Sequence, residues 1–484
     1  MKRQLGLSLM VLAVLAVPPA WSQTGSDQSQ SGSTDQSQSG STNQSQSGST
    51  DQSQSGSTDQ SQQSSTGPQV AYTHPEQLPP LAMLNEVTAN TGIRLKLATG
   101  SSTNYNSYGG SSQASWQTLG TIRGGVDITQ IRPTLMWDLG YNGGLGLSAL
   151  SSRSSSNYTS LNQNGRANIL WQFGKRWQMA VKDTYIYTND PFEPYLTVDH
   201  VPTFNDPNPV FYIPLSVTEA NVGSVNLTYQ MTQHDSLNFT GTESFQRYFN
   251  SVLSGNNSYS YSAGTNYEHV FSARLSAGGG YSFTALDFGH GLSRSGIQSI
   301  AGFASYRLSP NISVSGWVGP ENTANKSIVP TFCFPGYGCF GYHAVYQDQW
   351  SVAEGATFGW SGARNAFQAG FRHQVSSGGG FLGTVRLYQL TAAYRRPLTQ
   401  RWNFSAGFSY NNSLSVSQFR PGGFQKGLQG TVNLTRSISQ SWVASMYYAA
   451  VHQTQNYYSP LPATVTANGV GITLRYSWGH SLGR

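Results

Sequence analysis

From about residue 91 onward, the chain consists of runs in which apolar and polar residues alternate. In the stretch LTQRWNFSAGFSY (398–410), every second position from Trp402 is apolar or aromatic, namely Trp402, Phe404, Ala406, Phe408 and Tyr410. Successive side chains of a β-strand point to opposite faces, so a period of two predicts a strand with one aromatic and one polar face. The question is which solvent the aromatic face meets.

Short polar turns join pairs of these runs. Each turn has an apolar residue, a few turn formers and a second apolar or aromatic residue, as in Phe173–Trp177, Phe271–Leu275, Leu308–Ile312 and Ile438–Trp442. An apolar pair at a spacing of four would also suit a helix. Because the alternation continues on both flanks of the turns, we interpret them as β-hairpins.

Longer connections separate one hairpin from the next. They are polar and irregular, and we expect them near 142–161, 188–215, 249–256, 288–295, 321–345, 376–382, 414–423 and 456–465. Counting the runs between turns and connections gives about 18 strands, an even number, as single-chain bacterial barrels have. Short turns on one side and long loops on the other are typical of an outer-membrane barrel with periplasmic turns.

The composition identifies the solvent of the aromatic face. Charged residues are 10% of the chain, against about 25% in ordinary soluble domains, while aromatic residues reach 12% and there are 53 glycines. After the N-terminus no apolar run approaches the roughly 20 residues of a membrane helix. Strands that face lipid on one side and water on the other explain both observations. Lipid cannot hydrogen-bond a free strand edge, so the sheet must close.

We therefore predict an all-β protein, a transmembrane antiparallel up-and-down β-barrel over residues 91–484 in a bacterial outer membrane. Residues 1–22 predict a secretory signal peptide, with a basic start, an apolar run over 5–17 and the small residues Ala20 and Ser22. A single anchoring helix is the alternative, but the run is short and ends at two prolines.

Two further segments precede the predicted barrel. Residues 23–66 repeat GSTDQSQS with a period of about eight and contain no apolar residue to bury, so we expect disorder. This tract is either a tether for a partner or a spacer. Residues 67–90 are a proline-rich linker, because Pro75, Pro79 and Pro80 argue against a continuous helix or a central strand.

The only cysteines, Cys333 and Cys339, lie in CFPGYGC. In an exported chain this pair predicts a disulfide, which would contribute about 2 kcal/mol by the chain-entropy model. A zinc site that recruited His343 would lack a fourth ligand nearby. We predict no metal and no cofactor.

Asp183 and Glu243 each follow the first apolar residue of a predicted strand by six positions, so they should lie at similar heights on two strands separated by one. Simple alternation puts both on the aromatic face, where a carboxylate in lipid would cost several kcal/mol. Either a bulge turns them inward or they lie in the headgroup zone. If they point inward, they would join a charged constriction of the pore together with Arg166, Lys182, Arg247 and Arg372. The alternative is a generic polar lining.

Other functions have little support in the sequence. The net charge of +6 is spread over single residues and not clustered, so we expect no nucleic-acid partner. Asp287, His290 and Ser293 in DFGHGLS are the nearest approach to a catalytic set, but their spacing is not specific. We predict that the protein is not an enzyme and assign no catalytic residue.

The segment GITLRYSW (Gly471–Trp478) resembles the terminal assembly signal of outer-membrane barrel proteins, with Gly471, Leu474 and Tyr476 in its characteristic places. Residues 91–484 resemble porin-like barrels. The resemblance implies membrane lipid and the outer-membrane assembly machinery as partners, and porins are often homo-oligomers. We expect a channel for passive diffusion of small hydrophilic solutes through a pore lined with Ser, Asn, Gln and Thr. The alternative is a closed structural or export-associated barrel, for example one related to exopolysaccharide.

Overall fold

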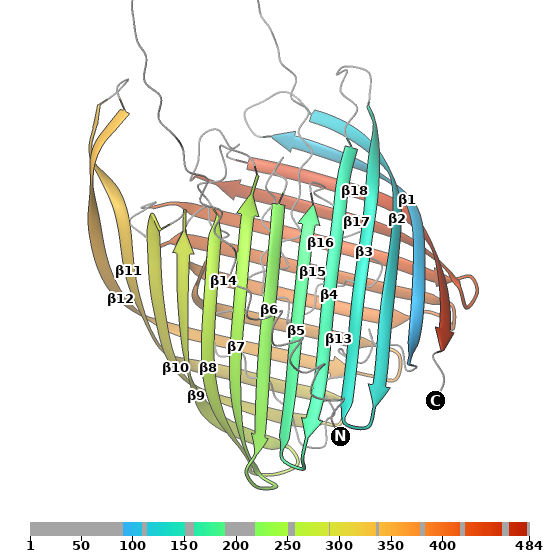
Figure 1. Ribbon diagram of the computed structural model, residues 1–484, viewed down its shortest axis with the longest axis horizontal. Coiled ribbons are helices and arrows are strands. Elements are labelled where there is room, and N and C mark those ends of the chain that lie inside the picture. Colours follow the sequence, from blue (N-terminus) through green and yellow to red (C-terminus); the bar gives the residue numbers. More distant parts are fainter. Residues whose placement is uncertain are drawn as a thin grey trace, which may run out of the picture. The chain divides into compact units, whose positions relative to one another are not determined.

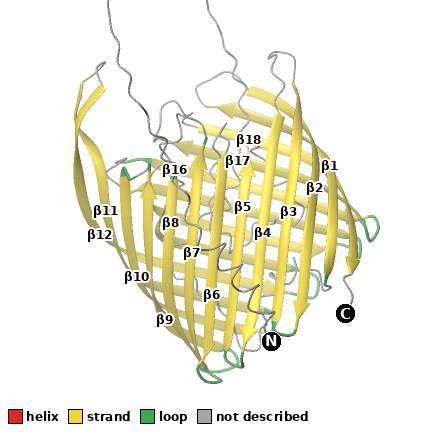
Figure 2. Cartoon of the chain, in the orientation of Figure 1, coloured by secondary structure: helices red, strands yellow, loops and turns green. Residues whose placement is uncertain are grey.

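The computed structural model describes residues 91–108, 114–150, 159–188, 218–249, 257–289, 291–334, 338–377, 383–416, 422–456 and 464–481. These residues form 18 antiparallel strands of one sheet (Figures 1 and 2). The strands are β1 (Gly92–Tyr108), β2 (Ala114–Arg132), β3 (Leu135–Leu150), β4 (Thr159–Phe173), β5 (Trp177–Thr188), β6 (Thr218–Gln230), β7 (Asp235–Tyr248), β8 (Ser258–Val270), β9 (Leu275–Phe288), β10 (Ser293–Ser309), β11 (Ile312–Phe334), β12 (Gly338–Ser361), β13 (Ala366–Ser377), β14 (Thr384–Pro397), β15 (Trp402–Ser415), β16 (Phe424–Ser437), β17 (Trp442–Gln455) and β18 (Thr464–Ser481).

Each strand pairs with its neighbours in sequence, and the sheet closes on itself. The first strand, β1, pairs with β18 from Gly92 opposite Ser481 to Tyr108 opposite Val465. This pairing gives both terminal strands of the sheet a hydrogen-bonded neighbour, which a structure in lipid requires. The predicted up-and-down barrel is confirmed, and so is its strand number.

The short turns at one end of the barrel share a hydrogen-bond pattern that explains their sequence. In the turn between β14 and β15, the N–H of Leu398 donates to the carbonyl of Trp402 at 2.8 Å. The hydroxyl of Thr399 accepts the N–H groups of Arg401 and Trp402 at 3.2 and 3.1 Å. The turns that begin at Met231, Phe271 and Ile438 repeat this pattern, each with Thr or Ser in second place. A hydroxyl there satisfies two backbone donors that the turn leaves without a ladder partner.

Several connections at the other end are shorter than expected. The region 321–345 is mostly strand, because β11 runs to Phe334 and β12 begins at Gly338. Likewise β3 continues to Leu150, and only residues 289–292 separate β9 from β10. A hairpin that extends beyond the membrane meets water on both faces, so its strands need no apolar alternation and resemble a loop in sequence.

Alternate residues of each strand face either outward or toward the interior of the barrel. In β15, the aromatic side of the 398–410 stretch faces outward, whereas Ser409 and Asn411 on the other side are buried. Exposed apolar side chains such as Leu428 and Ile472 extend the outer face over neighbouring strands. This is the apolar band of a barrel that spans a bacterial outer membrane, with the short turns at the periplasmic end.

Among the described residues, no helix has the length and hydrophobicity needed to span a membrane. The predicted signal peptide (1–22), the repeat (23–66) and the linker (67–90) lie outside the described residues.

Cys333 and Cys339 stand opposite each other in the register of β11 and β12. The Cα atoms of directly opposed residues in an antiparallel pair are about 4.5–5.5 Å apart, within the range that a disulfide spans. The two side chains lie outside the described residues, so the disulfide remains a prediction. The register is compatible with it.

The predicted assembly segment lies within the closing strand, β18. Leu474 and Tyr476 face outward, and the ring of Tyr476 lies 4.9 Å from that of Trp442. Gly471 faces inward, where a Cβ atom would lie 2.3 Å from Cε1 of Tyr447 on β17. Glycine at this position therefore lets the Tyr447 ring lie flat against the inner wall.

We expect Gly471→Ala to lower the free energy of unfolding by about 1–3 kcal/mol, because the added methyl group must displace the Tyr447 ring. Urea unfolding of the barrel in lipid vesicles measures this change. Gly427→Ala is the matched control, since a Cβ there meets nothing within 4 Å. In a chain that already carries Tyr447→Ser, adding Gly471→Ala should lower the free energy of unfolding much less than it does in the wild type. An equal loss with and without the ring would contradict this explanation.

Candidate functional site

The inner wall of the barrel carries a row of basic residues on β18, β1, β2, β4 and β5. Arg475 and Arg123 both stand opposite Ala98 of β1, so the three lie at one height. Further inward-facing cations follow at steps of two residues toward the periplasmic end of the wall. We call this set the basic strip: Arg475, Arg123, Lys96, Arg94, Arg166 and Lys182.

Two buried carboxylates hold the middle of the basic strip. Asp127 of β2 forms ion pairs with Lys96 and with Arg166, the latter at 3.4 Å. Asp138 of β3, whose side chain is 2% exposed, accepts from Nε of Arg166 at 3.1 Å and from the hydroxyl of Thr129 at 2.9 Å. These contacts fix the Arg166 guanidinium against the wall. With six cations and two carboxylates, the strip keeps a net positive charge.

Of the six residues predicted to line the pore, the structure places three on the inner face. Arg166 and Lys182 belong to the basic strip. Arg372 of β13 is on the opposite part of the wall and donates to the Oε1 atom of Gln389 on β14. Sequence reasoning missed Lys96, Asp127 and Asp138, although their places in the alternation of β1, β2 and β3 carried the information.

The other three predicted residues lie on the outer face, which corrects the constriction hypothesis. Asp183 and Glu243 both flank Gly223, so their heights match as expected. The ladders of β5 and β7 run without a bulge, and nothing turns these two side chains inward. Arg247 is also outside, where it donates to the Tyr259 hydroxyl at 3.0 Å.

Polar neighbours explain how these groups are accommodated outside. Asp183 accepts from Asn221 at 2.7 Å. Arg247 lies 4.9 Å from the Phe245 ring centroid and 3.8 Å from Glu219. Tyr185, Tyr187, Tyr259 and Tyr261 surround this group on the same outer face. Tyrosines mixed with polar residues are typical of the headgroup level of a membrane, and the headgroup position of Asp183 and Glu243 stays a prediction.

Strands that are not neighbours in the sheet touch inside the barrel at its loop end. Leu286 and Phe288 of β9, Ile297 of β10 and Val375 of β13 form one buried cluster, and Val416 packs against it. We call this cluster the wall contact. It narrows the lumen between β9–β10 and β13–β15 at the extracellular end.

Hydrogen bonds to β11 explain the inward bend of β13. The ladder between β12 and β13 ends where Glu354 stands opposite His373, although β12 continues for many more residues. Beyond that point the N–H of Val375 donates to Oε1 of Glu321 on β11 at 2.9 Å, and Ser351 donates to the same oxygen at 3.1 Å. The Glu321 carboxylate thus takes the place of the β12 backbone as acceptor.

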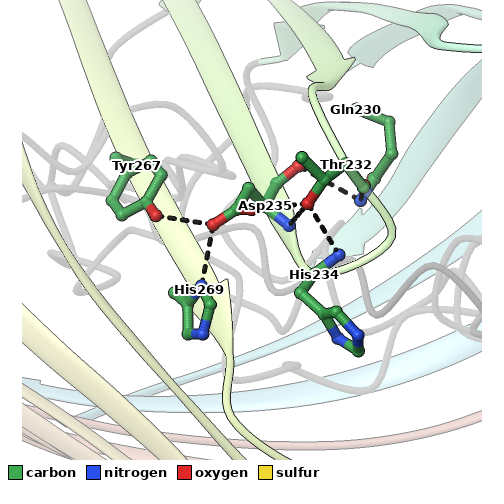
Figure 3. A network of polar contacts seen from close by, with 6 residues as sticks. All are labelled: Gln230, Thr232, His234, Asp235, Tyr267 and His269. Atoms are coloured by element: carbon green, nitrogen blue, oxygen red, sulfur yellow. Dashed lines mark hydrogen bonds and ion pairs between the residues drawn. The ribbon is translucent and has the colours of Figure 1, made fainter.

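A separate polar network lies on the outer face at the periplasmic end (Figure 3). Asp235 accepts from the Tyr267 hydroxyl at 2.6 Å and contacts Nδ1 of His269 at 2.7 Å. Thr232 donates to the same carboxylate and accepts from the N–H of His234. These bonds tie β8 to the turn between β6 and β7, so we assign the network to the stability of that turn.

The two described members of the candidate catalytic set, Asp287 and Ser293, do not face each other. Asp287 faces outward and pairs with Arg294 at 2.9 Å, whereas Ser293 is buried on the inner face. His290 and residues 189–214 lie outside the described residues. Within the described ranges, no group of three or more His, Cys, Asp or Glu side chains has the geometry of a metal site.

We expect Arg166→Gln to destabilise the barrel by about 1–3 kcal/mol, because the buried Asp138 carboxylate loses its charged donor. Adding Asp138→Asn to Arg166→Gln should recover part of the lost stability, since the side chains at positions 138 and 166 are then both neutral. Unfolding in urea measures both, and Arg396→Gln on the exposed rim is the control. If the double variant loses the sum of the two single losses, the pair is not coupled.

No protein-family model matches the chain, and no curated protein matches it in sequence. Among solved structures, the outer membrane protein OpdK of Pseudomonas aeruginosa aligns with a TM-score of 0.38 and 10% identity over 80% of this chain and 99% of that one. OccAB2 of Acinetobacter baumannii aligns with 0.38 and 11% over 80% and 98%. The ferric-catecholate import receptor Fiu of E. coli aligns with 0.39 and 8% over 81% and 82%. These similarities are too low to assign a solute or a mechanism.

Proposed function

We propose that the barrel is a passive outer-membrane channel for small hydrophilic solutes and that the basic strip gives it a preference for anions. The observation that carries the proposal is the position of the strip. Its residues occupy successive inward-facing rows from Arg475 and Arg123 down to Lys182, a distance of about 20 Å along the strands. An anion that moves along this wall stays near a cation over that whole distance.

The strip acts on the solute through its field and needs no conformational step. Low-dielectric walls lined by one sign of charge concentrate ions of the other sign in the lumen. Lys96 and Arg166 are held by Asp127 and Asp138, so their positions are set before a solute arrives. The rest of the inner wall is mainly Ser, Thr, Asn and Gln, whose hydroxyl and amide groups replace water around a polar solute.

The wall contact favours a second candidate function. A barrel whose interior is closed by Phe288, Ile297 and Val375 would serve as a structural or export-associated protein without general pore activity. The two candidates differ in one measurable property. A channel gives stable open steps in a planar bilayer, whereas a closed barrel gives none.

The proposal predicts the ion selectivity of those open steps. Replacing Arg123, Arg475 and Lys182 together by Gln should lower the ratio of anion to cation permeability at least about twofold, because three cations leave the lumen. The reversal potential in a salt gradient measures this ratio. Arg396→Gln with Arg436→Gln is the matched control, since both residues lie on the outer face at the periplasmic end.

Two results would contradict the proposal. An unchanged reversal potential in the triple variant would show that the basic strip does not act on permeating ions. Absence of open steps from the refolded wild-type protein would favour the closed barrel.

A further inference from the structure

The three most exposed large hydrophobic side chains in the described part of the barrel lie on one face of one strand. They are Tyr342, Tyr346 and Trp350 of β12, with exposed fractions of 67%, 72% and 71%. They follow one another at steps of four residues, so all three point outward from the barrel. Exposure of this kind on three successive rings indicates a surface that something else covers.

The height of these rings places two of them above the lipid. Trp360 and Trp350 are on the same outer face of β12, ten residues apart. At about 3.3 Å per residue and a tilt of about 40°, this separation corresponds to about 25 Å along the membrane normal, the height of the apolar band. Glu354 lies on the same face between them, so the apolar band ends no higher than Trp350, and Tyr346 and Tyr342 lie at least about 10 and 20 Å beyond its outer boundary.

The hairpin that carries the rings extends past its neighbours. β11 and β12 have 23 and 24 residues, whereas β10 pairs with β11 only as far as Ser293 opposite Ser327. On the other side, the pairing of β12 with β13 ends at Glu354. Tyr342 therefore stands on a two-stranded ribbon that projects from the barrel wall (Figure 1).

Polar side chains accompany the rings on the same outer face. Nζ of Lys326 lies 5.6 Å from the Tyr346 ring centroid. Asn322 stands opposite Trp350, and Asp348 lies between Tyr346 and Trp350 in the sequence of β12. The neighbouring row of β10 carries Arg294, which is paired with Asp287 at 2.9 Å. The surface thus combines flat apolar rings with donors, acceptors and nearly balanced charge.

We propose that this face of the β11–β12 hairpin binds the saccharide headgroup of an outer-leaflet glycolipid. A sugar ring has an apolar C–H face that stacks on an aromatic ring, and hydroxyl groups that both donate and accept hydrogen bonds. Rings on a rigid strand with Lys326, Asn322 and Asp348 beside them meet both requirements. A purely anionic ligand would need an excess of cations, which this face does not have.

Continuity with the lipid-facing wall argues for a lipid-anchored sugar and not a free one. The face that carries the three rings continues downward past Val352 and the carboxylate of Glu354 into Phe358 and Trp360 of the apolar band. A molecule whose acyl chains lie against those residues holds its headgroup at the level of Tyr346 and Tyr342. The inference does not depend on whether the lumen conducts.

The test uses the full chain refolded in detergent and purified lipopolysaccharide as the probe. We expect Tyr342→Ser, Tyr346→Ser and Trp350→Ser together to weaken binding about tenfold or more, because three stacking contacts are lost. Binding of lipid A alone, which lacks the further saccharides of lipopolysaccharide, should not change. A matched control replaces Phe271, Tyr306 and Trp442 by Ser, three outward aromatic residues at the periplasmic end, and should bind lipopolysaccharide like the wild type.

Two further arms keep the result interpretable. The variant Tyr342→Phe, Tyr346→Phe, Trp350→Phe keeps an aromatic ring at all three positions and should retain binding, which separates a loss of stacking from a loss of folding. Polysaccharide released from its lipid should bind much more weakly than the intact molecule. Unchanged binding in the Ser variant would overturn the proposal, as would loss of binding in the Phe variant or equal binding of the released polysaccharide.

Discussion

The backbone hydrogen bonds of the sheet are the constraint on which the rest of the structure depends. In hydrocarbon there is no water to satisfy an exposed N–H or C=O group, so every strand within the membrane needs a neighbour on both sides. Strands that follow one another in the chain pair with each other, and the pairing of β1 with β18 over 17 residues gives the first and last strands their second neighbour. Closure then fixes which face of each strand meets lipid and which faces inward, because the side-chain period is two.

The division into two faces organises the charged residues. The inward-facing Asp127 and Asp138 are buried and paired with cations of neighbouring strands, whereas the outward Asp183 and Glu243 lie among tyrosines and amides. At the loop end the barrel departs from a regular cylinder, since β13 leaves β12 and bonds to Glu321 of β11. The same departure narrows the lumen and leaves the upper part of the β11–β12 hairpin standing apart from β13.

Much of the fold could be predicted from the sequence because the signals are local. Alternation in runs such as 402–410 and turns such as Leu398–Trp402 each lie within a few residues, and together they gave the strand number. Alternation also placed Asp183 and Glu243 correctly on the aromatic face. The bulge invoked to turn them inward is absent, and neighbouring tyrosines and amides surround the carboxylates on the outer face.

The parts that could not be predicted depend on register between distant segments. Asp127 and Arg166 are 39 positions apart in sequence, and only the ladders across β3 and β4 bring them together. The wall contact joins strands that are not neighbours in the sheet, and no local pattern marks Val375 or Val416. The length of β11 and β12 was missed because a ribbon in water on both faces has no alternation to detect.

Closure between the first and last strands is tested most directly by cross-linking them. In a chain with Cys333 and Cys339 replaced by Ser, new cysteines at Thr99 and Leu474 stand directly opposite in the register and on one face. They should form a disulfide in the folded barrel, whereas cysteines at Thr99 and Thr473 point to opposite faces and should not. Failure of the first pair to cross-link, or equal cross-linking of both pairs, would contradict a closed barrel with this register.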